Sequence, residues 1–482
     1  MKLTAEQQAP VNSSLPEGII RVEALAGTGK TSTLIKLTKN HPDKRFLYLT
    51  YNKSMAEEAK RKFFGNVVCK TTHSLCWSRF GREYKRKLGE MRMLDWAGRA
   101  KTYGVTNNKF DWFRASVLRL TTMNFIQSAD PEVSEIHIPD MYQDAEAKAR
   151  QVMVDAAANV WDDMCNLLDV QTLMPHDGYL KLYQLSEPAL LYDVVLLDEA
   201  QDANGATLGI LEKMSRRASV VMVGDPYQQI YGFRGSVNAL AKIKPVEHYA
   251  LTGSFRFGEE IAQVANKVLK GYFNCGLNLH GLGGPSVYKM AEVYDNNIGT
   301  DDVIIARANA TLYEIAFDAF EQGRLVGFAG GFNDEFLWTM RSIASILSGS
   351  GESKHPFFSR FHNATELREY AKESGDVEIS SAYGLYSRRR DALFLLGELK
   401  DNAVSFDRAE VKLTTAHKSK GLQFDNVYVC GDFLRGEEGD IVTPERAKRN
   451  NIDMGEEARL FYVALTRAKR KLTVPEIYSE VL

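Results

Sequence analysis

The sequence predicts an α/β fold of two doubly wound parallel-sheet domains with helical insertions. Six short segments are almost continuously apolar, as strands buried on both faces of a parallel sheet are. They are residues 19–25, 46–51, 193–200, 219–225, 302–307 and 426–432. Helical patterns lie between them, and strands that alternate with helices form doubly wound sheets. The chain has 482 residues, which exceeds one ordinary core and is enough for two such sheets.

Two long stretches lack strand character and are expected to be insertions. Between Arg82 and Pro188 the strand signal fades, and residues 144–168 show an amphipathic helical pattern. A second insertion is expected between about Phe332 and Asp407, bounded by glycine-rich stretches. The predicted organisation is a first sheet domain at 1–83 and 189–250 with an insertion at 84–188, and a second at 251–331 and 405–482 with an insertion at 332–404.

Composition excludes several classes of protein. Hydrophobic residues make up 44% and charged residues 25%, which is typical of a globular enzyme. The five cysteines are scattered without a C-x-x-C pair, so we expect a reducing cytosol and neither a disulfide framework nor a zinc site. No signal peptide is legible at the start and no long apolar run occurs, so we expect neither export nor a membrane span. The net charge of -2 means that a nucleic-acid site would be a local groove.

The first candidate site lies where an apolar strand meets a helix. Residues 24–31 form a turn of small residues that ends in Lys30 and Thr31. Backbone N–H groups in such a turn, together with the helix N-terminus, surround a phosphate chain. Lys30 would neutralise the β and γ phosphates, and the Thr31 hydroxyl would bind Mg²⁺. The strict pattern G-x-x-x-x-G-K-[ST] is missed at one position, because Ala24 replaces the first glycine; the alternative is a chance turn ahead of a lysine.

Two acids follow another apolar run. Asp198 comes at the end of a predicted buried strand, where a carboxylate would hold Mg²⁺, and Glu199 would polarise the attacking water. Acidic loops are common on protein surfaces, so this pair alone is weak. Paired with the phosphate loop, it is strong support for a nucleotide site.

An acid, aromatic residues, amides and an arginine cluster after a third apolar run, at residues 223–236. From the residues alone, Tyr231 and Phe233 are explained about equally well as core side chains and as DNA-binding side chains. The segment nevertheless resembles motif III of the UvrD, PcrA and Rep group of superfamily 1 DNA helicases.

Further motifs of that group follow in the family's order. Gln7 is similar to the adenine-reading Q motif. Segments that resemble motifs Ia, Ib, IV, V and VI are residues 48–60, 71–75, 251–257, 415–424 and 456–469. The motifs span residues 7 to 469, so chance agreement is negligible.

The resemblance implies two RecA-like domains of the P-loop NTPase type that bind ATP and Mg²⁺ between them. The residues it implies for catalysis are Lys30, Asp198, Glu199, Gln228, Arg256 and Arg467. Thr31 and Asp198 would hold Mg²⁺ in the first domain, and the two arginines would act from the second domain on closure. The residues it implies for nucleotide binding are Gln7, Ala26, Gly27, Thr28, Gly29, Lys30, Thr31, Ser32, Phe255 and Gln423. Those it implies for DNA binding are Tyr51, Asn52, Thr72, His73, Tyr231, Phe233, Arg234, His417 and Lys420.

The chain departs from the family pattern at three named positions. Gln423 replaces the ribose-contacting glutamate of motif V, Phe233 replaces the tryptophan of motif III, and Ser32 replaces an arginine after the phosphate-loop threonine. Altered nucleotide affinity and base stacking are expected from these changes. The residues at 52–54 and 417–421 are similar to those of the F-box helicase branch, although no F-box motif is recognisable in the sequence.

The resemblance predicts an ATP-dependent 3′ to 5′ DNA helicase that acts on single-stranded DNA and single-strand/duplex junctions in replication, recombination or repair. Single-strand-binding or recombinase proteins would be partners, in the cytoplasm of a bacterial or phage-infected cell or in a nucleus. Two alternatives stay open: a translocase that strips proteins from single strands, and an ATP-gated DNA-binding subunit of a repair or defence complex.

Two remaining features favour unspecialised interpretations. The run Arg388, Arg389 and Arg390 is more often a solvated face than a duplex contact. Apart from His73 and His417, which fall in DNA-facing motifs, the histidines lack ligand spacing, so no metal other than Mg²⁺ is expected.

Overall fold

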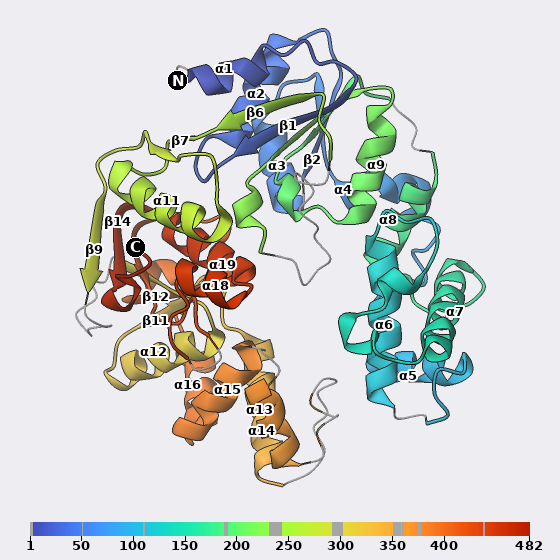
Figure 1. Ribbon diagram of the computed structural model, residues 1–482, viewed down its shortest axis with the longest axis vertical. Helices are drawn as coiled ribbons and strands as arrows, with labels where there is room; N and C mark the ends of the chain where they lie inside the picture. The colour runs from blue at the N-terminus through green and yellow to red at the C-terminus, as the bar shows by residue number, and fades with distance from the viewer. Residues whose placement is uncertain are drawn as a thin grey trace. The chain divides into compact units, whose positions relative to one another are not determined.

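The computed structural model describes two compact units (Figure 1). The described residues are 3–50, 52–108, 111–187, 191–230, 243–291, 302–349, 358, 361, 363–373, 377–436 and 439–482. The first unit consists of Met1–Ala24 and Gly29–Leu251, and the second of Leu25–Thr28 and Thr252–Leu482.

The first unit is built on a six-stranded parallel sheet with the strand order β3-β2-β4-β5-β1-β6. Its strands are β1 (Gly18–Ala24), β2 (Phe46–Thr50), β3 (Val67–Thr71), β4 (Val194–Leu197), β5 (Ser219–Gly224) and β6 (Glu247–Leu251). The four inner strands are buried almost throughout, because helices cover both faces of the sheet.

Alternate residues of these strands pack on opposite faces. Tyr48 and Leu196 belong to a core formed with α1 (Ala5–Val11), α2 (Lys30–Asn40) and α3 (Lys53–Lys62). Leu47 and Leu197 belong to a second core, formed with α8 (His176–Leu185) and α9 (Gly205–Ser215). The period of two along a strand therefore decides which side chains face the α2 helix.

The stretch between β3 and β4 is helical. It contains α4 (Thr72–Cys76), α5 (Met93–Thr102), α6 (Trp112–Gln127), α7 (Ala147–Cys165) and α8. Trp96, Phe125 and Trp161 lie in a core of its own. Among the described residues of this stretch the one β-type pairing is an isolated bridge between Leu88 and Met174.

The second unit also has a six-stranded parallel sheet, with the order β11-β12-β10-β13-β14-β9. Its strands are β9 (Val287–Ala291), β10 (Asp302–Ala306), β11 (Val326–Phe328), β12 (Val411–Thr415), β13 (Phe424–Val429) and β14 (Ala468–Pro475), and a separate pair is formed by β7 (Gly253–Ser254) and β8 (His280–Gly281). Its helices are α11 (Glu259–Phe273), α12 (Asn309–Glu321), α13 (Asp334–Leu347), α14 (Ala364–Glu373), α15 (Val377–Arg388), α16 (Ala392–Asn402), α17 (Ala416–Ser419), α18 (Pro444–Asn450) and α19 (Gly455–Leu465).

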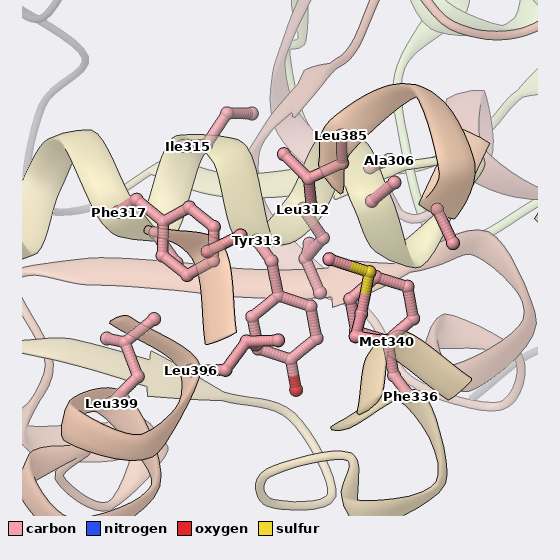
Figure 2. Close-up of a cluster of buried hydrophobic side chains, with 14 of the residues drawn as sticks. Ala306, Leu312, Tyr313, Ile315, Phe317, Phe336, Met340, Leu385, Leu396 and Leu399 are labelled. Atoms are coloured by element: carbon pink, nitrogen blue, oxygen red, sulfur yellow. The ribbon is translucent and has the colours of Figure 1, made fainter. Parts of the chain in front are cut away.

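One continuous core joins the second sheet to the helices α12 to α16. Figure 2 shows Tyr313 of α12 at its centre, between side chains of α13 and α16. The Tyr313 ring is stacked on Phe336 with 4.9 Å between the ring centroids. Leu396 and Leu413, from α16 and β12, share this cluster. Helices of the expected 332–404 insertion thus pack directly on the sheet layer.

The predicted α/β class with two parallel sheets is confirmed, and all six predicted strands are present. Their ends differ from the expected ones by at most three residues. Two residues of the basic run are ion-paired: Arg388 lies 3.2 Å from Glu314, and Arg389 lies 2.9 Å from Glu321. The third, Arg390, lies over the Tyr386 ring, 5.4 Å from its centroid. Within the described part of the chain, no helix combines the length and apolar character that crossing a membrane requires.

Candidate functional site

The loop after β1 has the backbone geometry of a phosphate-binding turn. Gly27 and Gly29 have φ angles of 75° and 80°, a region that favours glycine. Helix α2 begins at Lys30, directly after this turn. Its N-cap residue is Gly29, which has no side chain to accept a hydrogen bond from the first-turn amides. The first-turn amides of α2 are therefore oriented toward an anion. Ala24, by contrast, is the last residue of strand β1 and is paired with Leu251.

Asp198 lies at the carboxyl end of β4 and is almost completely buried. Its Oδ2 accepts hydrogen bonds from the Thr31 hydroxyl at 2.8 Å and the Tyr48 hydroxyl at 2.9 Å, and its Oδ1 accepts the backbone N–H of Glu199 at 3.0 Å. Burial raises the pKa of Asp198 and the charge of Glu199 adds to this, whereas Lys30 and the hydroxyl donors oppose it. The carboxylate is thereby fixed beside Thr31, the second residue of α2.

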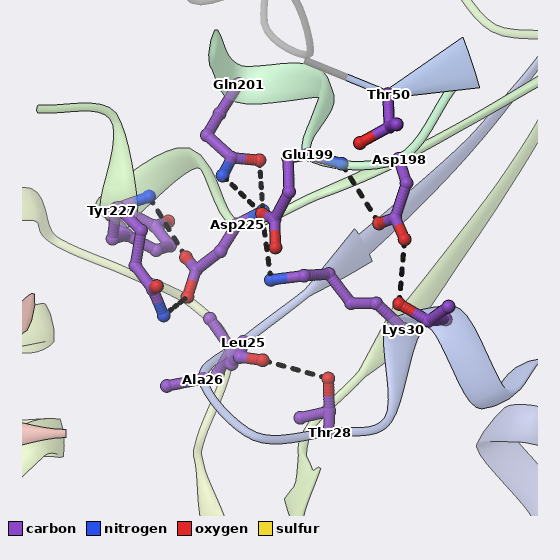
Figure 3. Close-up of polar contacts among 12 residues, drawn as sticks. Leu25, Ala26, Thr28, Lys30, Thr50, Asp198, Glu199, Gln201, Asp225 and Tyr227 are labelled. Carbon is purple, nitrogen blue, oxygen red and sulfur yellow. Dashed lines mark hydrogen bonds and ion pairs between the residues drawn. The ribbon is translucent and has the colours of Figure 1, made fainter. Parts of the chain in front are cut away.

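Glu199 occupies a strained backbone conformation, with φ of 53°. Such a conformation costs a non-glycine residue about 1 to 3 kcal/mol and is common at functional sites. Its carboxylate lies 3.4 Å from Lys30 Nζ and accepts a hydrogen bond of 2.7 Å from Gln201 Nε2 (Figure 3). The turn therefore directs Glu199 toward the phosphate-loop lysine.

A second buried acid, Asp225, follows β5. Its carboxylate accepts hydrogen bonds from Tyr227 N at 3.1 Å and from Gln228 Nε2 at 2.8 Å, and its backbone N–H donates to Gln201 Oε1 at 3.0 Å (Figure 3). Burial raises the pKa of Asp225 to about 6 although Lys30 opposes the shift. Gln201 thus links the ends of β4 and β5, and Asp225 holds the predicted catalytic Gln228.

Sequence reasoning gave no role to Tyr48, Gln201 or Asp225. Asp225 was detectable, because it directly follows a continuous apolar run just as Asp198 does. Tyr48 and Gln201 carry no comparable signal, since their contacts depend on how neighbouring strands are paired.

The residues at this edge of the sheet fit a nucleoside triphosphate with Mg²⁺. The glycine turn at the N-terminus of α2 and the ammonium group of Lys30 suit the phosphates. The Thr31 hydroxyl and the Asp198 carboxylate, 2.8 Å apart, are oxygen ligands of the kind that Mg²⁺ prefers. The two oxygens lie within hydrogen-bond distance of each other, so one cation bound beside them could contact both.

Two further predicted catalytic residues meet within the second unit. Arg256 Nη1 donates to the Thr466 carbonyl at 2.7 Å. Arg467, next along the chain, is 1% exposed and donates to the carbonyls of Val463 at 3.0 Å and Leu422 at 3.2 Å. Carbonyl oxygens thus hold both guanidinium groups.

Comparisons with known proteins show which family the chain is similar to. Residues 3–244 match the UvrD/REP helicase N-terminal domain, and residues 332–479 match the UvrD-like helicase C-terminal domain. The chain belongs to the UvrD/REP helicase family. F-box DNA helicase 1 of Gallus gallus is 31% identical over all of this chain and 50% of its own length. F-box DNA helicase protein 1 of Schizosaccharomyces pombe is 28% identical over 99% of this chain and 58% of its own length. ATP-dependent DNA helicase Rep of Escherichia coli is 40% identical over 17% of this chain and 11% of its own length.

The chain therefore spans about half the length of the two F-box relatives. Their similarity over the whole chain confirms the likeness to the F-box branch that the sequence indicated.

Three of the residues that the UvrD/REP resemblance assigns to DNA lie just beyond β2 and β3. Asn52 caps α3 by accepting a 2.8 Å hydrogen bond from Met55 N. His73, beside the buried Thr72 in α4, lies 2.9 Å from Asp177 Oδ1 of α8. Burial raises the pKa of Asp177, but the hydrogen bonds from His73 and Gln127 outweigh it and leave the pKa below its ordinary value.

A pocket of about 150 Å³ in the first unit connects these residues with the acids after β4. Thr72, His73 and Asp177 contribute to its wall, and so do Asp198 and Glu199. The structure thus brings two DNA-binding candidates of motif Ib, Thr72 and His73, and the predicted catalytic acids Asp198 and Glu199 to one cavity.

The other residues predicted from the UvrD/REP motifs lie at separate places in the structure. Gln7 is buried and caps its own helix, since its Oε1 accepts the Thr4 N–H at 3.2 Å. Ser32 and Gln423 are exposed, and Phe255, His417 and Lys420 are half-buried. In the second unit, Ala26 N donates to the Tyr462 hydroxyl at 3.2 Å, and Thr28 Oγ1 donates to the Leu25 carbonyl at 2.8 Å. Tyr51, Tyr231, Phe233 and Arg234 lie outside the described residues.

Proposed function

We propose that this chain is an ATP-dependent DNA helicase or translocase that moves 3′ to 5′ on single-stranded DNA. One observation carries the proposal: Lys30, Thr31, Asp198 and Glu199 converge at the carboxyl edge of a parallel sheet, in a member of the UvrD/REP helicase family. Ligands of doubly wound sheets bind at this edge.

Each residue of the group has a distinct proposed task. Lys30 neutralises phosphate charge, and Thr31 and Asp198 hold Mg²⁺, which supplies further charge neutralisation when bound. Glu199, aimed into the site by its strained backbone, orients a water molecule and accepts its proton. Gln228 follows β5, and its side chain donates a hydrogen bond to Asp225. Its proposed task is to sense the bound nucleotide.

The test of ATP use is Lys30→Ala, with Lys36→Ala as the matched control. Lys36 lies on the same helix α2 but is exposed. We expect Lys30→Ala to abolish DNA-stimulated ATP hydrolysis and to leave single-strand binding largely intact, because the proposed ligand of this lysine is the triphosphate and not DNA. Lys36→Ala should behave as the wild type. Near-normal turnover of Lys30→Ala would overturn the proposal.

Polarity and substrate need a separate experiment. One assay compares the unwinding of 3′-tailed and 5′-tailed duplexes. A second assay measures displacement of a recombinase filament from single-stranded DNA. We expect strand separation with the 3′ tail only. Displacement without unwinding would favour the translocase, and nucleotide-dependent DNA binding without either activity would favour a subunit of a larger repair or defence complex.

A further inference from the structure

Tyr48 is a polar side chain inside the core of the first unit. It lies in β2 with 1% of its surface exposed, and its ring packs against Phe63 of the α3 C-terminus with 4.8 Å between centroids. A buried tyrosine needs a partner for its hydroxyl group. The partner here is Asp198.

Strand register explains why this pair meets. Tyr48 of β2 is paired with Leu196 of β4, and both side chains face α2. Asp198 is two residues further along, so the period of two returns it to the same face. A tyrosine at position 48 is long enough to reach it, and the Tyr48 hydroxyl lies 2.9 Å from Asp198 Oδ2.

Asp198 is held by three donors. Thr31 Oγ1 and the Tyr48 hydroxyl donate to Oδ2, and the backbone of Glu199 donates to Oδ1. Thr31 is a proposed cation ligand and Glu199 is the proposed base, so both have tasks of their own. The tyrosine has none: burial, and next the charge of Asp198, raise its pKa far above the ordinary value, so its hydroxyl stays a donor.

We propose that Tyr48 is a positioning residue for the divalent cation: its hydroxyl fixes the orientation of the Asp198 carboxylate toward the position that Thr31 shares. This inference rests on the proposed nucleotide site and adds a residue to it. Hydrogen-bond partners of metal ligands typically contribute about 10- to 100-fold in metal affinity. The competing explanation is that Tyr48 only fills the core, with its hydroxyl satisfied incidentally.

Tyr48→Phe separates the two explanations, because it keeps the ring against Phe63 and removes only the hydroxyl. The matched control is Tyr84→Phe, which removes another buried hydroxyl of the same unit, one that donates to the Cys165 carbonyl at 3.0 Å. Mn²⁺ binding in the presence of ADP is followed by electron paramagnetic resonance, and ADP binding in EDTA by calorimetry. We expect Tyr48→Phe to weaken Mn²⁺ binding roughly tenfold, with ADP binding in EDTA unchanged and Tyr84→Phe like the wild type.

A third variant, Phe63→Leu, loosens the packing but keeps the hydroxyl. It should lower the melting temperature without changing Mn²⁺ affinity. The inference is overturned if the wild type and Tyr48→Phe bind Mn²⁺ equally, or if Phe63→Leu weakens Mn²⁺ as much as Tyr48→Phe does. A wild-type protein that binds neither ADP nor Mn²⁺–ADP would instead refute the proposed function itself.

Discussion

The buried carboxyl group of Asp225 should make the protein less stable as the pH rises, which is unusual for an aspartate. Asp225 is fully buried after β5, and burial raises its pKa from 3.8 to about 6. A group with a raised pKa in the folded state stabilises that state fully below its unfolded pKa. The contribution is lost as pH rises through the folded pKa.

The magnitude follows from the two pKa values. They differ by about 2, and each tenfold change in proton affinity corresponds to about 1.4 kcal/mol, so ionising Asp225 costs about 3 kcal/mol of unfolding free energy. Asp225→Asn removes this ionisation and keeps the side chain's size. We therefore expect the stability of the variant relative to the wild type to rise by about 3 kcal/mol between pH 4 and pH 8.

Urea unfolding without nucleotide, followed by circular dichroism at several pH values, measures this difference. Asp193→Asn is the control, because Arg45 donates to that carboxylate and holds its pKa below the ordinary value. The contribution of Asp193 is lost only as the pH falls from its unfolded pKa of 3.8 through its lowered folded pKa, so the difference between Asp193→Asn and the wild type should stay nearly flat from pH 4 to pH 8. A difference between Asp225→Asn and wild type that stays flat from pH 4 to pH 8 would refute the reasoning.

Two further predictions concern the nucleotide. Glu199→Gln should still bind ATP but hydrolyse it about 10² to 10⁴ times more slowly, because the base is lost; nucleotide titration and phosphate release measure both steps, and loss of binding would contradict the roles given to Asp198 and Glu199. Gln423→Glu should lower the KM for ATP, since hydrogen bonds to a charged acceptor are roughly twice as strong as neutral ones; steady-state hydrolysis decides, and an unchanged or higher KM would show that this exposed position does not face the ribose.

The four inner strands of the first sheet were predicted from sequence, whereas in the second sheet the inner strands β10 and β13 were predicted and the inner strands β12 and β14 were not. None of the edge strands of the two sheets was predicted. β4 and β5 read as continuous apolar runs because helices cover both of their faces. β6 carries Glu247 and His248, and β9 carries Lys289, because each ends its sheet and faces solvent. Charged residues are usual on such edges, and they remove the apolar signal.

The same limit applies to the candidate site. Lys30, Asp198 and Asp225 each follow a strand, so their common location at one edge of the sheet can be derived from a parallel fold. The hydrogen bond between Tyr48 and Asp198 requires the register of β2 against β4, which no local pattern specifies. Residues that act through a neighbour on another strand are therefore found only in the structure.

Whether a departure from a motif affects the site depends on the backbone conformation at that residue. The phosphate loop lacks its first glycine, yet Ala24 lies in β1, paired with Leu251, where an ordinary side chain is accommodated. Gly27 differs, because its φ of 75° disfavours other residues and an added Cβ would clash with Ser254 Oγ. A methyl group is thus tolerated at the first position and excluded at the second, so the mismatch at Ala24 leaves the phosphate-binding turn intact.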